Sequence, residues 1–62
     1  MKILSEYFGD EIDRHAEIYF DENFFKVRVR NELGSYFVAF FNNLDEAENF
    51  AENYVRGETN EP

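Results

Sequence analysis

Few residues of this chain could do chemistry, and the first is its only histidine, His15, which stands near Asp13 and Glu17. A histidine beside a carboxylate can act as a general base, because its pKa lies close to neutral pH. No serine stands in a recognisable nucleophile motif and the chain has no cysteine, so nucleophilic catalysis lacks its central residue. We therefore interpret His15 as a solvated residue at the start of a strand, and we predict that the protein is not an enzyme.

Asp10, Glu11 and Asp13 supply oxygen ligands of the kind that Ca²⁺ prefers. They lack the Asp-x-Asx-x-Asx-Gly spacing and the terminal bidentate glutamate of a calcium-binding loop. The sequence also contains no glycine-rich phosphate loop and no pair of histidines at metal-binding spacing. We expect a solvated acidic loop here, with no metal and no cofactor.

Lys26, Arg28 and Arg30 are of more interest, because they alternate with apolar residues through the segment 24–30. A period of two is typical of a β-strand with one buried face, so the three cations form a row on the other face. Such a row can contact a partner or pair with acids on neighbouring strands, each exposed pair contributing at most about 1 kcal/mol.

Two further strands are predicted beside this one. The alternation within 16–21 predicts a half-buried strand, and the unbroken apolar run 36–41 predicts another. Polar turns separate the three strands, and Gly34 can take the positive φ that a tight turn requires.

The segment 44–56 is predicted to be a helix. Asn43 and Glu46 have the spacing of a capping box, and Gly57 suits the C-terminal cap. Apolar residues recur at three- and four-residue spacing through the segment, so they form one stripe. The polar side of the helix carries three carboxylates that we treat as an alternative acidic face: Asp45, Glu48 and Glu52.

These elements predict one α+β domain over residues 1–62, in which a three-stranded antiparallel β-sheet packs on one C-terminal α-helix in the order βββα. Residues 1–11 fit two descriptions. Their apolar residues have the spacing of a short helix that would end at Gly9, and they fit an extended arm equally well. Residues 58–62 are polar and are predicted to be a flexible tail.

Length and charge restrict the function further. A 62-residue domain has a small core, which eight phenylalanines and four tyrosines enlarge, and a homodimer or larger oligomer is a common supplement. The formal net charge of −8 opposes general binding to phosphate backbones. The absence of cysteine and of any long apolar run favours a cytoplasmic protein without a signal peptide or membrane contact.

One helix can cover only one face of a sheet, so the other face is left open. If Arg30 pairs with Tyr36 across the turn, the alternate residues from Phe37 to Phe41 face the helix, whereas a shift of one residue would exchange the two sets. An apolar patch that no element covers usually marks an interface, here with the N-terminal segment, an identical subunit or a separate protein. The residues expected to bind a partner are Tyr19, Lys26, Arg28, Arg30, Tyr36, Val38 and Phe40.

The run from Tyr36 to Val55, Tyr-Phe-Val-Ala-Phe-Phe-Asn-Asn-Leu-Asp-Glu-Ala-Glu-Asn-Phe-Ala-Glu-Asn-Tyr-Val, resembles small acidic proteins of tailed phages that infect marine cyanobacteria. Such proteins often end with a strand, a Leu-Asp-Glu-Ala helix start and an aromatic helix end. The likeness covers residues 18–57. It implies a small accessory factor that binds a host protein in the host cytoplasm and alters its behaviour, and it implies no site residues.

Three functions stay open at this point. The first is a non-enzymatic protein-interaction module that binds a protein, or itself, through the open face. The second is nucleic-acid binding by the same face, with Tyr19 and Tyr36 stacking on bases; the order of three strands and a helix resembles AP2/integrase-type DNA-binding domains, although the chain has no tryptophan. The third is an acidic mimic of nucleic acid, in which the helix carboxylates occupy a DNA-binding protein.

Overall fold

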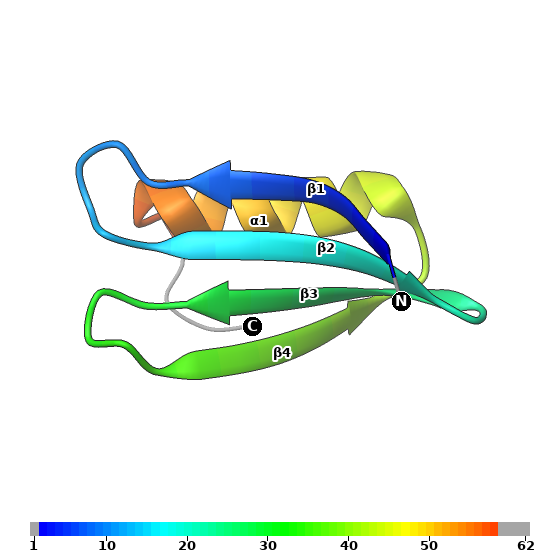
Figure 1. Ribbon diagram of the computed structural model, residues 1–62. Helices are drawn as coiled ribbons and strands as arrows, with labels where there is room; N and C mark the ends of the chain where they lie inside the picture. The colour runs from blue at the N-terminus through cyan, green and yellow to red at the C-terminus, as the bar shows by residue number, and fades with distance from the viewer. Residues whose placement is uncertain (1, 59–62) are drawn as a thin grey trace.

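The computed structural model describes residues 2–58, which form a four-stranded antiparallel sheet with one helix against one of its faces (Figure 1). The strands lie side by side in chain order, so each connection is a hairpin. The elements are β1 (Lys2–Phe8), β2 (His15–Asp21), β3 (Phe24–Arg30), β4 (Tyr36–Phe41) and α1 (Leu44–Arg56). The α+β class and the C-terminal helix agree with the sequence-based prediction. Of the expected tail 58–62, only Glu58 lies within the described residues.

The prediction of three strands was wrong, because the N-terminal segment is a fourth strand rather than a short helix or an arm. β1 pairs with β2, with Tyr7 opposite Ala16 and Ser5 opposite Ile18, but Ile3 lies opposite Tyr19. The register therefore shifts between Ile3 and Ser5. A bulge of this kind breaks the period of two, and the remaining apolar spacing imitates a helix.

The two later hairpins have tight turns with recognisable chemistry. Between β2 and β3, Glu22 has a φ of 61° and is the one non-glycine residue with positive φ among residues 2–58. Between β3 and β4, the side-chain oxygen of Asn31 accepts hydrogen bonds from the backbone N–H groups of Leu33 and Ser35, both at 2.9 Å. This turn sets Arg30 opposite Tyr36, which confirms the register that the sequence analysis assumed.

The core lies between the sheet and α1. The helix contributes Ala47, Ala51, Tyr54 and Val55, and the sheet contributes Ala16, Ile18, Val27 and Val29, all buried. The strands supply these residues at every second position and the helix supplies them at three- and four-residue spacing. Partly buried aromatic residues on both layers extend the core at its margin: Tyr7, Phe25, Phe41 and Phe50.

Both ends of α1 are capped as the sequence predicts. The Asn43 side chain accepts a hydrogen bond from the Glu46 N–H at 2.8 Å, which is the N-cap bond of a capping box. Its side-chain amide also donates to the Glu46 carboxylate at 3.2 Å, so the carboxylate binds the Asn43 side chain rather than its backbone N–H. Gly57 has a φ of 84° and donates to the Tyr54 carbonyl at 3.1 Å. Within the described part of the chain, no helix is long and apolar enough to cross a membrane.

Candidate functional site

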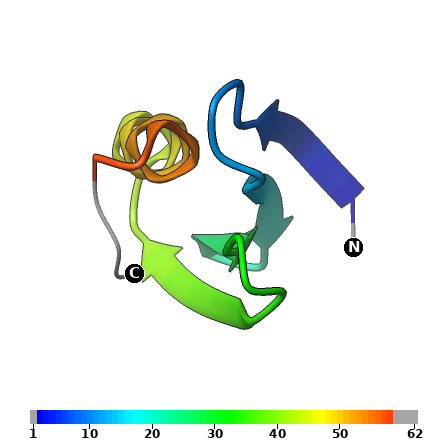
Figure 2. The same ribbon diagram turned by 90° about the vertical axis from the view of Figure 1, so that its left-hand side faces the viewer.

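The open sheet face is the side of the sheet opposite α1, and no described element lies over it (Figure 2). Cross-strand partners share a face in an antiparallel sheet, so the register identifies its members. All seven residues predicted from the sequence belong to it. The cross-strand rows are Tyr19–Lys26–Phe40, Arg28–Val38 and Arg30–Tyr36.

β4 provides the most exposed apolar part of this face. Tyr36 and Phe40 are each 61% exposed and Val38 is 44% exposed. The ring of Phe40 is supported by the ring of Phe24, which it meets edge to face with centroids 5.2 Å apart. Three large apolar side chains are therefore held in a row with their outer surfaces in water, an arrangement typical of an interface.

Arg28 lies at the centre of the open sheet face and is already engaged within the chain. Its Nη2 and Nε donate to one oxygen of the Glu17 carboxylate, at 2.6 and 3.1 Å. Its guanidinium also lies 5.6 Å from the ring centroid of Tyr36 and 5.9 Å from that of Tyr19, within the range of a cation–π contact. These contacts hold the Arg28 guanidinium in place between the rings of Tyr19 and Tyr36.

Glu17 is the acceptor at the centre of this network. Its side chain points to the open sheet face, but neighbouring side chains cover it, so the residue is only 7% exposed. Tyr19 donates its hydroxyl hydrogen to the same carboxylate oxygen at 3.0 Å. Burial by itself would raise the pKa of Glu17, but the hydrogen bonds from Arg28 and Tyr19 outweigh it and hold the pKa below its ordinary value. Burial, followed by the bond to the Glu17 carboxylate, raises the pKa of Tyr19.

The other two cations also have partners in the chain. Arg30 forms an ion pair with Asp13 at 3.1 Å, and the Lys26 ammonium lies 5.7 Å from the ring centroid of Tyr19. Glu17 and Asp13 thus offset two of the three positive charges, and Glu6 adds a further carboxylate through its pairing with Glu17. The surface around Lys26, Arg28 and Arg30 therefore has a net charge close to zero.

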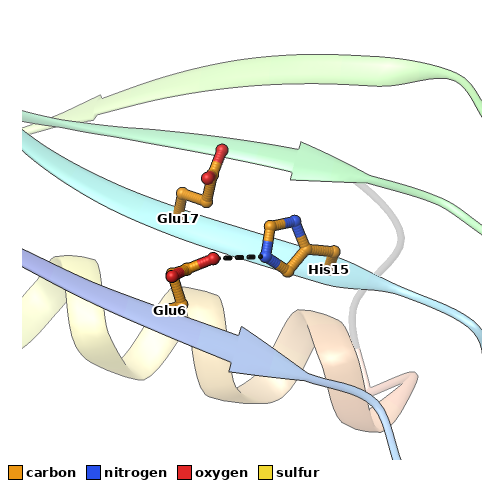
Figure 3. A group of neighbouring side chains, drawn as sticks. All are labelled: Glu6, His15 and Glu17. Atoms are coloured by element: carbon orange, nitrogen blue, oxygen red, sulfur yellow. Dashed lines mark hydrogen bonds and ion pairs between the residues drawn. The ribbon is translucent and has the colours of Figure 1, made fainter. Parts of the chain in front are cut away.

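Glu6, His15 and Glu17 form the one cluster of potential metal ligands found among the described residues (Figure 3). His15 Nε2 lies 3.1 Å from a Glu6 oxygen, and one ligand atom from each residue lies within 4.8 Å of the others. Bonds of about 2.0–2.2 Å to zinc would require the ligand atoms to come closer together than this. Arg28 also occupies an oxygen of Glu17, so the arrangement suits an ion-pair network better than a cation.

The alternative acidic face lies on the other side of the molecule from the open sheet face. Glu52 forms an ion pair with Arg56 at 3.0 Å. Glu48 and Glu52 also act on Tyr7 of β1, whose pKa is raised mainly by burial and further by these two charges. Asp45 is exposed in the first turn of α1. Glu48 and Glu52 therefore lie on the β1 side of the helix.

Sequence reasoning missed the part of the open sheet face that β1 contributes. Phe8 is 68% exposed and packs its ring at 4.8 Å from that of His15, and Glu6 pairs with Glu17. The alternation Glu6–Tyr7–Phe8 is too short to identify a strand. The bulge between Ile3 and Ser5 interrupts the alternation before it. Ile3, opposite Tyr19, completes this margin.

No protein-family model matches the chain, and no curated protein or solved structure matches it either. The resemblance to phage proteins therefore stays a prediction.

Proposed function

We propose that this chain is a small non-enzymatic protein-interaction module that binds a protein partner through the open sheet face. The observation that carries the proposal is the row Tyr36, Val38 and Phe40, which stays exposed beside a fixed guanidinium. Interface centres are enriched in aromatic residues and arginine. Aromatic rings give large contact areas at low entropic cost, and the Arg28 guanidinium is already held by contacts within the chain. The open sheet face combines both.

The charge arrangement favours a protein over a nucleic acid. Binding to a phosphate backbone draws its strength from free cations that release counterions. Here Arg28 and Arg30 already bind Glu17 and Asp13, so a phosphate would have to compete with carboxylates of the chain itself. The formal net charge of −8 adds repulsion at long range.

The partner that fits has an apolar patch for the β4 row and polar groups for the Arg28–Glu17 pair. The second oxygen of the Glu17 carboxylate and the tyrosine ring faces around this pair can accept hydrogen bonds from a partner without breaking the pair. Such contacts set the orientation of the partner more than its affinity. If the chain is phage-encoded, as the resemblance implies, that partner is a host protein in the host cytoplasm whose behaviour the chain modulates.

The test compares recovery of a partner from the native cell by the wild type and by a double variant, Arg28→Glu with Phe40→Ser. Both residues lie on the open sheet face outside the core, so circular dichroism should confirm that the variant folds. The matched control is Glu48→Gln with Glu52→Gln on the helix. We expect the sheet-face variant to lose the partner and the helix variant to keep it.

The opposite pattern would favour the acidic mimic, in which the helix carboxylates act on a DNA-binding protein. A third pattern would favour nucleic-acid binding: salt-dependent association with DNA or RNA that charge reversal at Arg28 and Arg30 abolishes. Equal recovery of the same partner by all variants would contradict the proposal.

A further inference from the structure

The sheet has two edge strands, β1 and β4, and among residues 2–58 only β1 carries features that protect an edge. Edge strands expose unpaired backbone groups, and proteins usually guard them with charges, prolines or bulges. β1 carries a bulge between Ile3 and Ser5 and a charge at Glu6. The β4 sequence, Tyr-Phe-Val-Ala-Phe-Phe, contains no charge and no proline, and its register with β3 is unbroken from Tyr36 to Phe41.

The hydrogen-bond pattern shows which backbone groups of β4 are unused. The Asn31 N–H donates to the Ser35 carbonyl at 2.9 Å and closes the hairpin. Bonded and non-bonded pairs alternate along an antiparallel ladder, so the next bonded residues of β4 are Phe37, Ala39 and Phe41. The N–H and C=O groups of the residues between them point away from β3, and no strand among residues 2–58 meets them. Those residues are Tyr36, Val38 and Phe40.

We infer that β4 pairs antiparallel with β4 of a second copy of this chain, so that two sheets join into one of eight strands. The register that uses every free group places Val38 opposite Val38 of the second copy, on the two-fold axis. Tyr36 of each copy then lies opposite Phe40 of the other. All three pairs are hydrogen-bonded pairs, because each residue directs its backbone groups outward.

A second copy fits this edge for reasons of shape and charge. In the inferred register, the bulky Phe37 of one copy lies opposite the small Ala39 of the other on the helix side of the sheet. Phe37 is 39% exposed in the single chain, whereas Ala39 is 9% exposed, so the pairing covers apolar surface without crowding. The uncharged strand also brings no like charges opposite each other, although each chain has a net charge of −8.

The pairing extends the open sheet face rather than hiding it. The side chains of Tyr36, Val38 and Phe40 stand perpendicular to the sheet, so edge pairing leaves them available. Two copies would present their apolar rows side by side at the middle of one continuous surface. The inference stands apart from the proposed function, because it concerns the edge and needs no partner protein.

The experiment uses solution mass and cysteine cross-linking of the full chain. Light scattering should give twice the mass of one chain at high concentration. Directly opposed Cα atoms in a hydrogen-bonded pair lie about 5.5 Å apart, within the span of about 4.4–6.8 Å that a disulfide requires. Because the chain has no cysteine, the variant Val38→Cys should form a covalent dimer on oxidation.

The control is Tyr36→Cys, whose two thiols would lie roughly 14 Å apart along the strands in the inferred register. We expect its cross-linking to be slower than that of Val38→Cys by about tenfold or more, because its Cα separation exceeds the disulfide range. Equal cross-linking by the two variants, or a wild type that stays monomeric up to millimolar concentration, would overturn the inference.

A second pair of variants tests the backbone directly. Val38→Pro removes an N–H that the single chain does not use, which an edge strand tolerates, whereas Val38→Thr keeps it. We expect the proline variant to be monomeric and the threonine variant dimeric. A proline variant that still dimerises would count against edge pairing.

Salt gives a further test of the dimer. Raising the salt concentration from roughly 0.05 to 0.5 M should strengthen the dimer, because it screens the repulsion between the two net negative charges.

Discussion

The guanidinium of Arg14 donates a hydrogen bond from Nη1 to the backbone carbonyl of Tyr54 at 2.9 Å, forty residues further along the chain. Its carbon atom Cζ also lies 4.6 Å from the centroid of the Tyr54 ring. Arg14 is only 7% exposed and extends an ion pair at 2.8 Å to Glu32 in the β3–β4 turn. One side chain thus joins the β1–β2 loop, the last turn of α1 and a distant hairpin, and it places a cation where the helix dipole favours one.

Replacing Arg14 should therefore destabilise the domain. We expect Arg14→Met to lower the free energy of unfolding by about 2–3 kcal/mol, because a buried carbonyl loses its charged donor. Glu32→Gln should also destabilise the wild type, since it leaves a buried guanidinium without its carboxylate. Chemical denaturation of both single variants and the double variant measures the coupling.

The double variant decides whether the ion pair carries this effect. In the Arg14→Met background, Glu32→Gln should change the stability very little, because the carboxylate no longer has its partner. Strictly additive losses would show that Arg14 acts independently of Glu32, through its contacts with Tyr54.

The Arg28–Glu17 pair should make stability depend on pH. The folded state lowers the pKa of Glu17 below its ordinary value of 4.5, so the folded chain binds fewer protons than the unfolded chain. The stabilisation is complete above that value and is lost as the pH falls through the lower, folded-state pKa. Glu17→Gln should cost about 1–2 kcal/mol at neutral pH, and the difference from the wild type should shrink in acid.

Urea denaturation of the wild type and Glu17→Gln at a series of pH values measures this difference. The comparison cancels the titration of the other carboxylates, which both proteins share. A difference that stays constant from neutral pH to well below 4.5 would contradict the role given to the ionised Glu17 carboxylate.

Two glycines with positive φ allow a matched test of the helix end. Gly57 and Gly34 have φ angles of 84° and 90°, so alanine at either position adds backbone strain of about 1–2 kcal/mol. A Cβ at Gly57 would lie 2.4 Å from Cδ1 of Ile12, whereas a Cβ at Gly34 would meet nothing within 4 Å. Thermal unfolding should show Gly57→Ala to be the less stable variant, and equal losses would exclude the contact with Ile12.

β1 should be essential to the fold rather than an accessory arm. Deleting residues 1–8 would uncover the edge of β2 and remove Tyr7 from the margin of the core. We expect that truncated chain to lose cooperative unfolding, because the domain is too small to spare a strand. A truncation of 1–8 that still unfolds cooperatively would restore the arm hypothesis.

Local patterns were sufficient to predict much of this domain. β3, β4 and α1 have the bounds expected from alternation, apolar spacing and caps, and β2 begins one residue earlier, at His15. Each of these elements has its signal within its own residues. β1 could not be predicted, because its bulge cancels the alternation and its pairing depends on β2, which follows it in the chain.

The open sheet face, too, could be predicted from the sequence only in part. The period of two assigned the alternate residues of β4 to opposite faces, but the sequence left two registers open; the bonds that Asn31 accepts in the folded turn decide between them. From sequence, the cations could either contact a partner or pair with acids on neighbouring strands. Only the folded chain shows that Glu17 and Asp13, eleven and seventeen residues away, pair with Arg28 and Arg30. The burial of Arg14 is likewise a tertiary result, since its partners in α1 and the β3–β4 turn meet only when the sheet and helix pack together. Short-range sterics and periodicity act between neighbours in the chain, whereas ion pairs and burial depend on which distant segments the folded chain brings together.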